Sequence, residues 1–94
     1  MSLQYKNEAA LQKACVKFAT GAGWLVYKFD SSTTVGVPDL ILMRDGDIIF
    51  IEMKHPNGLG VLSKKQCAEI VKIRRAGTTV HVIHDYEVFK RVTT

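Results

Sequence analysis

Residues 38–54 read PDLILMRDGDIIFIEMK, which is the pattern of a tight β-hairpin. Two apolar runs flank Asp45-Gly46, and Asp-Gly between such runs is a strong signal for a two-residue hairpin turn. With that turn Arg44 pairs with Asp47, and counting back along both strands places Asp39 opposite Glu52. Lys54 then shares a face with Glu52, because alternate residues of a strand point the same way.

The predicted register brings two carboxylates together at the open end of the hairpin. Opposed side chains have Cβ atoms about 4.5–5.5 Å apart, and two carboxylates about 4 Å apart repel by about 4 kcal/mol at an effective dielectric of 20. A divalent cation would offset this repulsion. Magnesium is commonly held by one or two carboxylates while it keeps several waters. The pattern therefore predicts a metal site formed by Asp39 and Glu52, with the carbonyl of Met53 in reach and Lys54 beside it.

Composition restricts the class of protein. The 94 residues are 47% hydrophobic and 23% charged, which predicts a single soluble domain over residues 1–94. No apolar run approaches the ~20 residues that span a membrane, and the start lacks the apolar stretch of a signal peptide. The net charge of +4 is compatible with a nucleic-acid partner. Cys15 and Cys67 are too few for a disulfide framework, and we expect both to be core thiols.

The remaining segments predict helices and strands around the hairpin. Residues 7–22 predict a helix capped by Asn7, and residues 24–29 a strand with Trp24 and Tyr27 in the core. Ser63-Lys64-Lys65-Gln66 matches a capping box that opens a helix to about residue 76. A strand over residues 79–83, added in parallel, and a helix over 85–91 complete an α/β order of αβββαβα. Both faces of the hairpin are apolar, so we expect helices to cover both.

Three short motifs together resemble a known family. Gly36-x-Pro38-Asp39, Glu52-x-Lys54 and the helix-opening Gln66 resemble the PD-(D/E)xK nucleases, and more narrowly the virus-type replication-repair nuclease (VRR-NUC) domain in its stand-alone, phage-like form. The resemblance covers nearly the whole chain. It implies a restriction-endonuclease-like core of order αβββαβ(α), with a mixed four-stranded sheet flanked by helices.

The resemblance also implies an activity. It implies an endodeoxyribonuclease that hydrolyses DNA phosphodiesters with Mg²⁺ or Mn²⁺. The resemblance to stand-alone members implies a homodimer that cuts branched DNA, such as four-way (Holliday) junctions in DNA repair. We accordingly expect DNA as the partner, no membrane, and a location in the cytoplasm of a bacterial or phage-infected cell.

The resemblance assigns roles residue by residue. Asp39 and Glu52 would be catalytic metal ligands together with the Met53 carbonyl, Lys54 the catalytic lysine, and Gln66 an accessory catalytic residue. Glu8 matches an acidic residue that such nucleases often carry on the first helix, and would be a further ligand. Gln66 equally completes the Ser63 capping box, and Glu8 equally suits a helix N-terminus. His55-Pro56 departs from the family, which commonly has a glycine after the lysine.

Other polar residues have two interpretations each. The side of the second helix formed by Lys64, Lys65, Lys72 and Arg75 is either a solvated face or a DNA-binding stripe that follows phosphates. Residues 31–34 either donate to DNA phosphates or form a flexible loop. We expect His55 in a surface loop and His81 and His84 at strand ends.

Two functions without catalysis remain as alternatives. A DNA-binding module would explain the basic charge but not the opposed carboxylates. A catalytically inactive relative could serve as a dimeric scaffold of the same fold, and it would tolerate the loss of Lys54.

Overall fold

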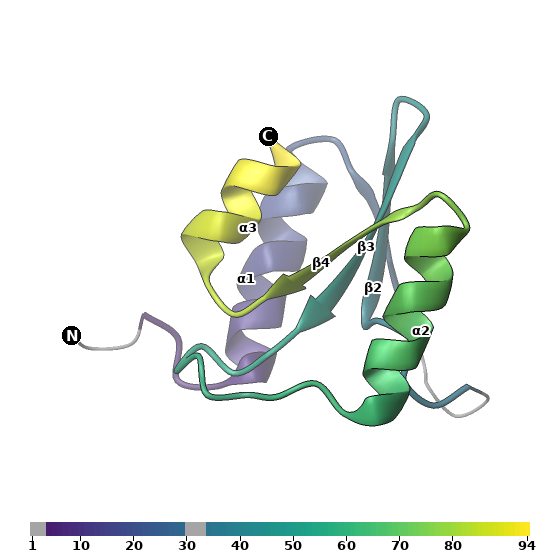
Figure 1. The fold of residues 1–94 in the computed structure, drawn as a ribbon. Helices are drawn as coiled ribbons and strands as arrows, with labels where there is room; N and C mark the ends of the chain where they lie inside the picture. The colour runs from purple at the N-terminus through teal and green to yellow at the C-terminus, as the bar shows by residue number, and fades with distance from the viewer. Residues whose placement is uncertain (1–3, 30–33) are drawn as a thin grey trace.

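A mixed four-stranded sheet with helices on both faces organises the chain (Figure 1). The structure is a computed structural model that describes residues 4–29 and 34–94. In chain order the elements are α1 (Glu8–Gly21), β1 (Leu25–Lys28), β2 (Leu40–Arg44), β3 (Asp47–Met53), α2 (Lys64–Arg75), β4 (Thr79–Ile83) and α3 (Tyr86–Thr93). Helices α1 and α3 lie together on one side of the sheet, and α2 lies on the other. The predicted element order and mixed sheet are confirmed.

The central hairpin has the register that the sequence predicts. Asp45 and Gly46 have φ values of 51° and 85°, and a two-residue type I′ turn requires positive φ at both positions. Arg44 pairs with Asp47, and the ladder continues to the pair of Leu40 and Ile51. Asp39 and Glu52 occupy the next position in this register, so the carboxylates meet where the ladder ends.

The outer strands complete the sheet in the order β1-β2-β3-β4. β1 pairs antiparallel with β2, and β4 pairs parallel with β3, as the crossover through α2 predicts. Glu52 lies level with Val82 of β4. The Lys54 amide also donates to the Ile83 carbonyl at 2.8 Å, which extends this pairing past the end of β3. The end of β3 is thus held from both sides.

The main core lies between the sheet and the pair of helices α1 and α3. Leu11 and Cys15 of α1 and Phe89 of α3 are fully buried there, against the hairpin face formed by Leu40, Leu42, Ile49 and Ile51. Trp24 closes one end of the core, and its indole Nε1 donates to the Thr93 carbonyl at 2.8 Å. This core fixes one face of the hairpin.

The helix ends follow their sequence signals. The Asn7 side chain accepts from the Ala10 amide at 2.8 Å and caps α1. Ser63 and Gln66 form the reciprocal bonds of a capping box at α2, and Asp85 caps α3. The predicted capping box is confirmed.

Three expectations about burial are wrong. Helix α2 packs against β4, which leaves the β1–β3 part of that sheet face open to solvent. The hairpin is therefore covered fully on one face only, and Ile48 is 46% exposed. Tyr27 is 54% exposed rather than in the core. Cys15 is buried as predicted, but Cys67 of α2 is exposed, whereas Ile70 of the same helix is buried.

Two sequence expectations concern segments at the limits of the described chain. Of the proposed phosphate-contacting loop, Ser31, Ser32 and Thr33 lie outside the described residues, and Thr34 is exposed. Within residues 4–29 and 34–94, no helix has both the length and the apolar character needed to cross a bilayer.

Candidate active site

The hairpin geometry fixes Asp39 at the edge of the predicted site. Its Oδ2 accepts a hydrogen bond from the Met53 amide at 2.8 Å, across the open end of the hairpin. Its main-chain carbonyl accepts from the Phe29 amide at 2.8 Å. Because both the side chain and the backbone are tied, the Asp39 carboxylate is held beside the end of β3.

Glu52 is the most deeply buried charged group at this end of the sheet. The residue is only 3% exposed. Its Oε2 accepts from the Gln66 side-chain Nε2 at 3.0 Å and lies 3.6 Å from the Lys54 Nζ. A buried carboxylate needs such partners, because an unpaired charge away from water is costly.

Gln66 links the lysine and the glutamate through a single amide. Its Oε1 accepts from the Lys54 Nζ at 3.0 Å and also from the Ser63 amide at 2.9 Å. An amide oxygen has two lone pairs, so both are used, while Nε2 donates to Glu52. The two interpretations of Gln66 are therefore compatible, since the same side chain completes the capping box and contacts the site.

The electrostatics of the site agree with the carboxylate repulsion that the register predicts. Burial, and after it the charge of Asp39, raise the pKa of Glu52 from its ordinary 4.5 to about 7, while Lys54 acts in the opposite direction. The charge of Glu8 also raises this pKa, which places Glu8 near the site. At neutral pH Glu52 is consequently poised between its two protonation states.

The donor set suits a hard divalent cation. Two carboxylates and the Met53 carbonyl are all oxygen ligands, which magnesium and manganese prefer. Adding a cation would also remove the carboxylate repulsion that raises the Glu52 pKa. Among the described residues, no group of three His, Cys, Asp or Glu side chains is gathered closely enough to hold one ion. Glu8 is exposed in the first turn of α1 and does not form such a group with the carboxylate pair.

Gly36 joins the loop before Asp39 to the start of α2. It has a φ of +91°, and a Cβ added there would lie 2.7 Å from the Lys65 carbonyl carbon and oxygen. The same Cβ would lie 3.0 Å from the Gln66 amide nitrogen. The sequence indicated Gly36 only as part of the motif before Asp39, because a contact across 29 positions leaves no local signal.

Four basic side chains of α2 face away from the sheet, whereas Arg74 donates to the Val80 carbonyl of β4 at 2.9 Å. At 100° per residue, positions 64, 65, 72 and 75 fall on the side of the helix opposite the buried Ile70, and all four are exposed. Lys72 pairs with Glu69 at 3.1 Å. Lys64 and Lys65 stand in the first turn, next to Gln66, so the stripe begins at the site.

The histidines do not join the carboxylates. The His55 Nδ1 accepts from the Asn57 amide at 3.1 Å, and the His55 carbonyl accepts from the Gly58 amide, so this residue shapes a turn. His84 is exposed and lies against Gly58. Burial lowers the pKa of His81, and Arg74 adds to this effect. None of them forms a metal-binding group with other described residues.

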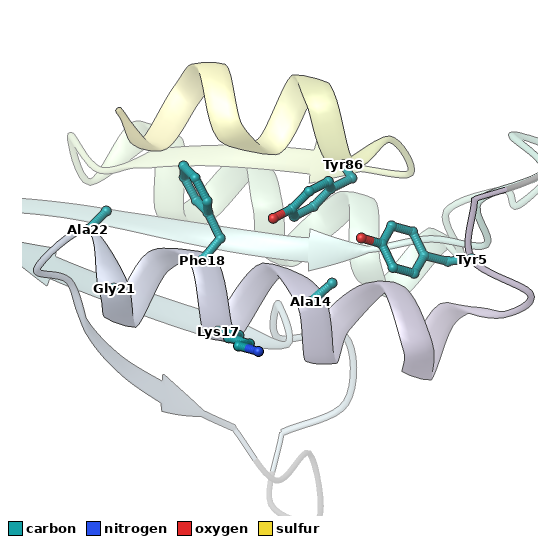
Figure 2. Close-up of a pocket in the computed structure, with 7 residues that line it drawn as sticks. All are labelled: Tyr5, Ala14, Lys17, Phe18, Gly21, Ala22 and Tyr86. Carbon is teal, nitrogen blue, oxygen red and sulfur yellow. The ribbon is translucent and has the colours of Figure 1, made fainter.

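A separate hollow lies on the far side of the sheet, between α1 and α3 (Figure 2). It measures about 610 Å³ and is lined by Tyr5, Ala14, Lys17, Phe18, Gly21, Ala22 and Tyr86. Tyr5 and Phe18 each pack edge-on against Tyr86. None of the predicted site residues lines this hollow.

The fold and the site together define a class of protein. A helix-first mixed sheet with PD and ExK motifs on its central hairpin is the arrangement of the PD-(D/E)xK nuclease fold. The model of the VRR-NUC domain family matches residues 2–85, and the chain belongs to this family. A solved structure described as a VRR_NUC domain has a TM-score of 0.77 and 23% identity, covering 90% of this chain and 91% of that one. None of the curated proteins matches the chain.

Gly36→Ala tests whether the loop contact positions the site. We expect DNA cleavage to fall by roughly 100-fold, because a shift of about 1 Å at a catalytic group has that order of effect. Gly23→Ala is the matched control, since Gly23 has the same φ of +91° but only the Arg44 side chain, at 3.7 Å, near its added Cβ. Both variants should lose about 1 kcal/mol of stability to backbone strain. Equal cleavage by the two variants would contradict the positioning role.

Glu52→Gln tests the buried charge without involving catalysis. A carboxyl whose pKa is raised by folding binds its proton more tightly in the folded state. In metal-free wild type, this group therefore lowers the unfolding free energy as pH rises from about 4.5 to about 7, by on the order of 2 kcal/mol. We expect urea denaturation in EDTA to show that loss in the wild type and not in Glu52→Gln. An identical pH dependence in both proteins would refute the assignment.

Proposed function

We infer that this chain is an endodeoxyribonuclease that hydrolyses DNA phosphodiesters with Mg²⁺ or Mn²⁺. One observation carries the proposal. The carboxylates of Asp39 and Glu52 are brought together at the end of a buried hairpin, and Gln66 ties Glu52 to Lys54. A structural role alone does not explain this arrangement, because opposed carboxylates destabilise the fold that holds them. Membership of the VRR-NUC family supports the same conclusion.

The proposed mechanism assigns each residue a part. Asp39, Glu52 and the Met53 carbonyl would hold the cation. When bound, it supplies a water of lowered pKa and stabilises charge that develops on the phosphate. Lys54 donates to the attacking water or to a phosphate oxygen. Gln66 keeps the Lys54 ammonium directed to the site and occupies one oxygen of Glu52, which leaves the other free.

The proposal extends to the substrate and the assembly. The stripe of Lys64, Lys65, Lys72 and Arg75 would follow the phosphate backbone away from the site, and Glu8 would act as a further ligand near the carboxylates. We propose branched DNA, such as a four-way junction, as the substrate, and a homodimer as the cutting unit, since two strands are most simply cut by two copies. The proposed location is the cytoplasm of a bacterial or phage-infected cell.

Lys54→Ala distinguishes a nuclease from a binding module or inactive scaffold. Wild type should cut a labelled four-way junction with Mg²⁺ or Mn²⁺ and not with EDTA, and flap, duplex and single-stranded DNA define the preference. We expect Lys54→Ala to lose at least ~100-fold in cleavage rate, as general acid–base groups contribute that order, while it still binds the junction. Lys13→Ala, which changes an exposed lysine on α1, is the control and should cut normally. Binding by wild type without cleavage of any substrate in either metal would favour the scaffold.

The basic stripe makes a separate prediction about binding. A Lys64→Ala/Lys65→Ala double variant should bind DNA more weakly, and the slope of log binding constant against log salt should fall by about 0.9 for each lost phosphate contact. Fluorescence anisotropy in EDTA at several salt concentrations measures this slope without cleavage. The control is Lys13→Ala/Lys17→Ala, which removes two exposed lysines from α1. An unchanged slope in the α2 variant would assign its lysines to a merely solvated face.

A further inference from the structure

The loop between β3 and α2 carries two large apolar side chains that are almost fully open to solvent. Leu59 is 79% exposed and Val61 is 85% exposed, more than any other large apolar side chain in residues 4–29 and 34–94. Exposed apolar residues scattered singly are ordinary on protein surfaces, but these two flank Gly60 on one loop. We call them the Leu59–Val61 pair.

The pair lies beside Lys54, the proposed catalytic lysine. A Cβ added at Gly60 would lie 3.3 Å from the Lys54 Cδ and 3.5 Å from the Lys54 Cβ, so the loop backbone runs against the stem of this lysine. Consecutive Cα atoms are about 3.8 Å apart, which places Leu59 and Val61 on either side of that contact. Figure 1 shows the segment between β3 and α2 passing along the end of the sheet at which β3 ends. The pair is therefore exposed next to the carboxylate site.

Hydrogen bonds hold the loop that leads to the pair in a defined turn. The Gly58 amide donates to the His55 carbonyl at 3.0 Å, and the Leu59 amide donates to the Asn57 Oδ1 at 2.9 Å. A Cβ added at Gly58 would lie 3.6 Å from the Cε1 of His84, directly after β4, so the turn also rests on the neighbouring strand end. A turn that is already ordered presents Leu59 to a partner at a small entropic cost.

The charges around the pair favour DNA as that partner. Residues 54–65 include Lys54, Lys64 and Lys65 and contain neither aspartate nor glutamate. Lys64 and Lys65 are exposed. An apolar pair flanked by lysines suits a partner that offers both phosphates and an apolar interior, and DNA offers its phosphates on the outside and the faces of its bases within the stack.

We propose that Leu59 and Val61 insert as an apolar wedge between the bases at the branch point of the bound DNA, next to the phosphate at the site. Leucine and other apolar side chains act as wedges in DNA-bending proteins, where new contacts offset the cost of unstacking a base step. Phosphates follow one another about every 3.4 Å along each strand, so a wedge beside Lys54 reaches the base steps next to the reacting phosphate.

The wedge gives a physical reason for selecting branched DNA. Opening a base step costs least where the bases are already mismatched or unpaired, and stacking is interrupted at a branch point. The pair therefore gains more from a junction than from intact duplex. The inference rests on the proposed function, which supplies DNA as the substrate, and it adds how that substrate is selected.

Fluorescence of 2-aminopurine at the branch point tests insertion without cleavage. This base analogue is dim when stacked and bright when unstacked, so wild type in EDTA should raise its fluorescence on binding a four-way junction. Leu59→Ser/Val61→Ser should lose this rise and bind the junction at least ~10-fold more weakly, because burial of a leucine side chain is worth more than one decade in affinity. Its loss of affinity for duplex should be smaller, because intact stacking opposes insertion.

Two further variants control the measurement. Leu59→Met/Val61→Ile keeps an apolar wedge and should keep the rise in fluorescence. Leu25→Ser/Ile48→Ser removes a leucine and a β-branched residue that are 52% and 46% exposed near the hairpin turn, and it should bind the junction as wild type does. Urea denaturation checks that each variant is folded, and the exposed loop variant should unfold as wild type does.

The outcomes separate the wedge from the activity. Cleavage of the junction by wild type without any rise in fluorescence on binding would overturn the inference and leave the proposed function intact. A rise that is lost only in the serine loop variant, with no cleavage by wild type in Mg²⁺ or Mn²⁺, would support the wedge and refute the nuclease. A loop variant that binds the junction normally but sediments with a different mass would assign the pair to a protein contact and overturn the wedge.

Discussion

The register of β2 against β3 is the constraint on which the rest of the structure depends. A slip of one residue would exchange the faces of every side chain on a strand, so Glu52 would leave the site and Ile51 would leave the core. The buried face formed by Leu40, Leu42, Ile49 and Ile51 makes that slip costly. The positive φ angles of Asp45 and Gly46 fix the turn from which the register is counted. Hydrophobic burial on one face of the hairpin therefore keeps the mutually repelling carboxylates of Asp39 and Glu52 in place on the other face.

At the open end of the hairpin, the carboxylate arrangement that suits a cation lowers the stability of the fold. A carboxylate with a pKa near 7 weakens the fold at neutral pH, and Gln66 limits that cost by donating to Glu52 while accepting from Lys54. Gln66 can do so because the Ser63 cap and the Gly36 contact fix the start of α2. The positions of the Glu52, Lys54 and Gln66 side chains therefore depend on the start of α2, on the close-packed Gly36 and on the register of the hairpin.

The sequence predicted those features that have local causes. The Asp-Gly turn specifies the hairpin register, the Ser63 and Gln66 spacing specifies the start of α2, and the PD and ExK motifs specify the family. It did not predict how far α2 reaches across the sheet, since periodicity gives the buried side of a helix but not its lateral position. That is why Tyr27 was expected in the core and is exposed. The Gly36 contact was likewise hidden, because it forms only when distant segments pack.

The proposed function depends on a divalent cation held by the opposed carboxylates of Asp39 and Glu52. Calorimetric titration of Mn²⁺ into metal-free wild type and Asp39→Asn tests it most directly, since asparagine keeps an oxygen that can accept from the Met53 amide and removes only the charge. We expect saturable binding to wild type and its loss in Asp39→Asn, with both proteins folded. Equal binding to the two proteins, or binding to neither, would contradict it.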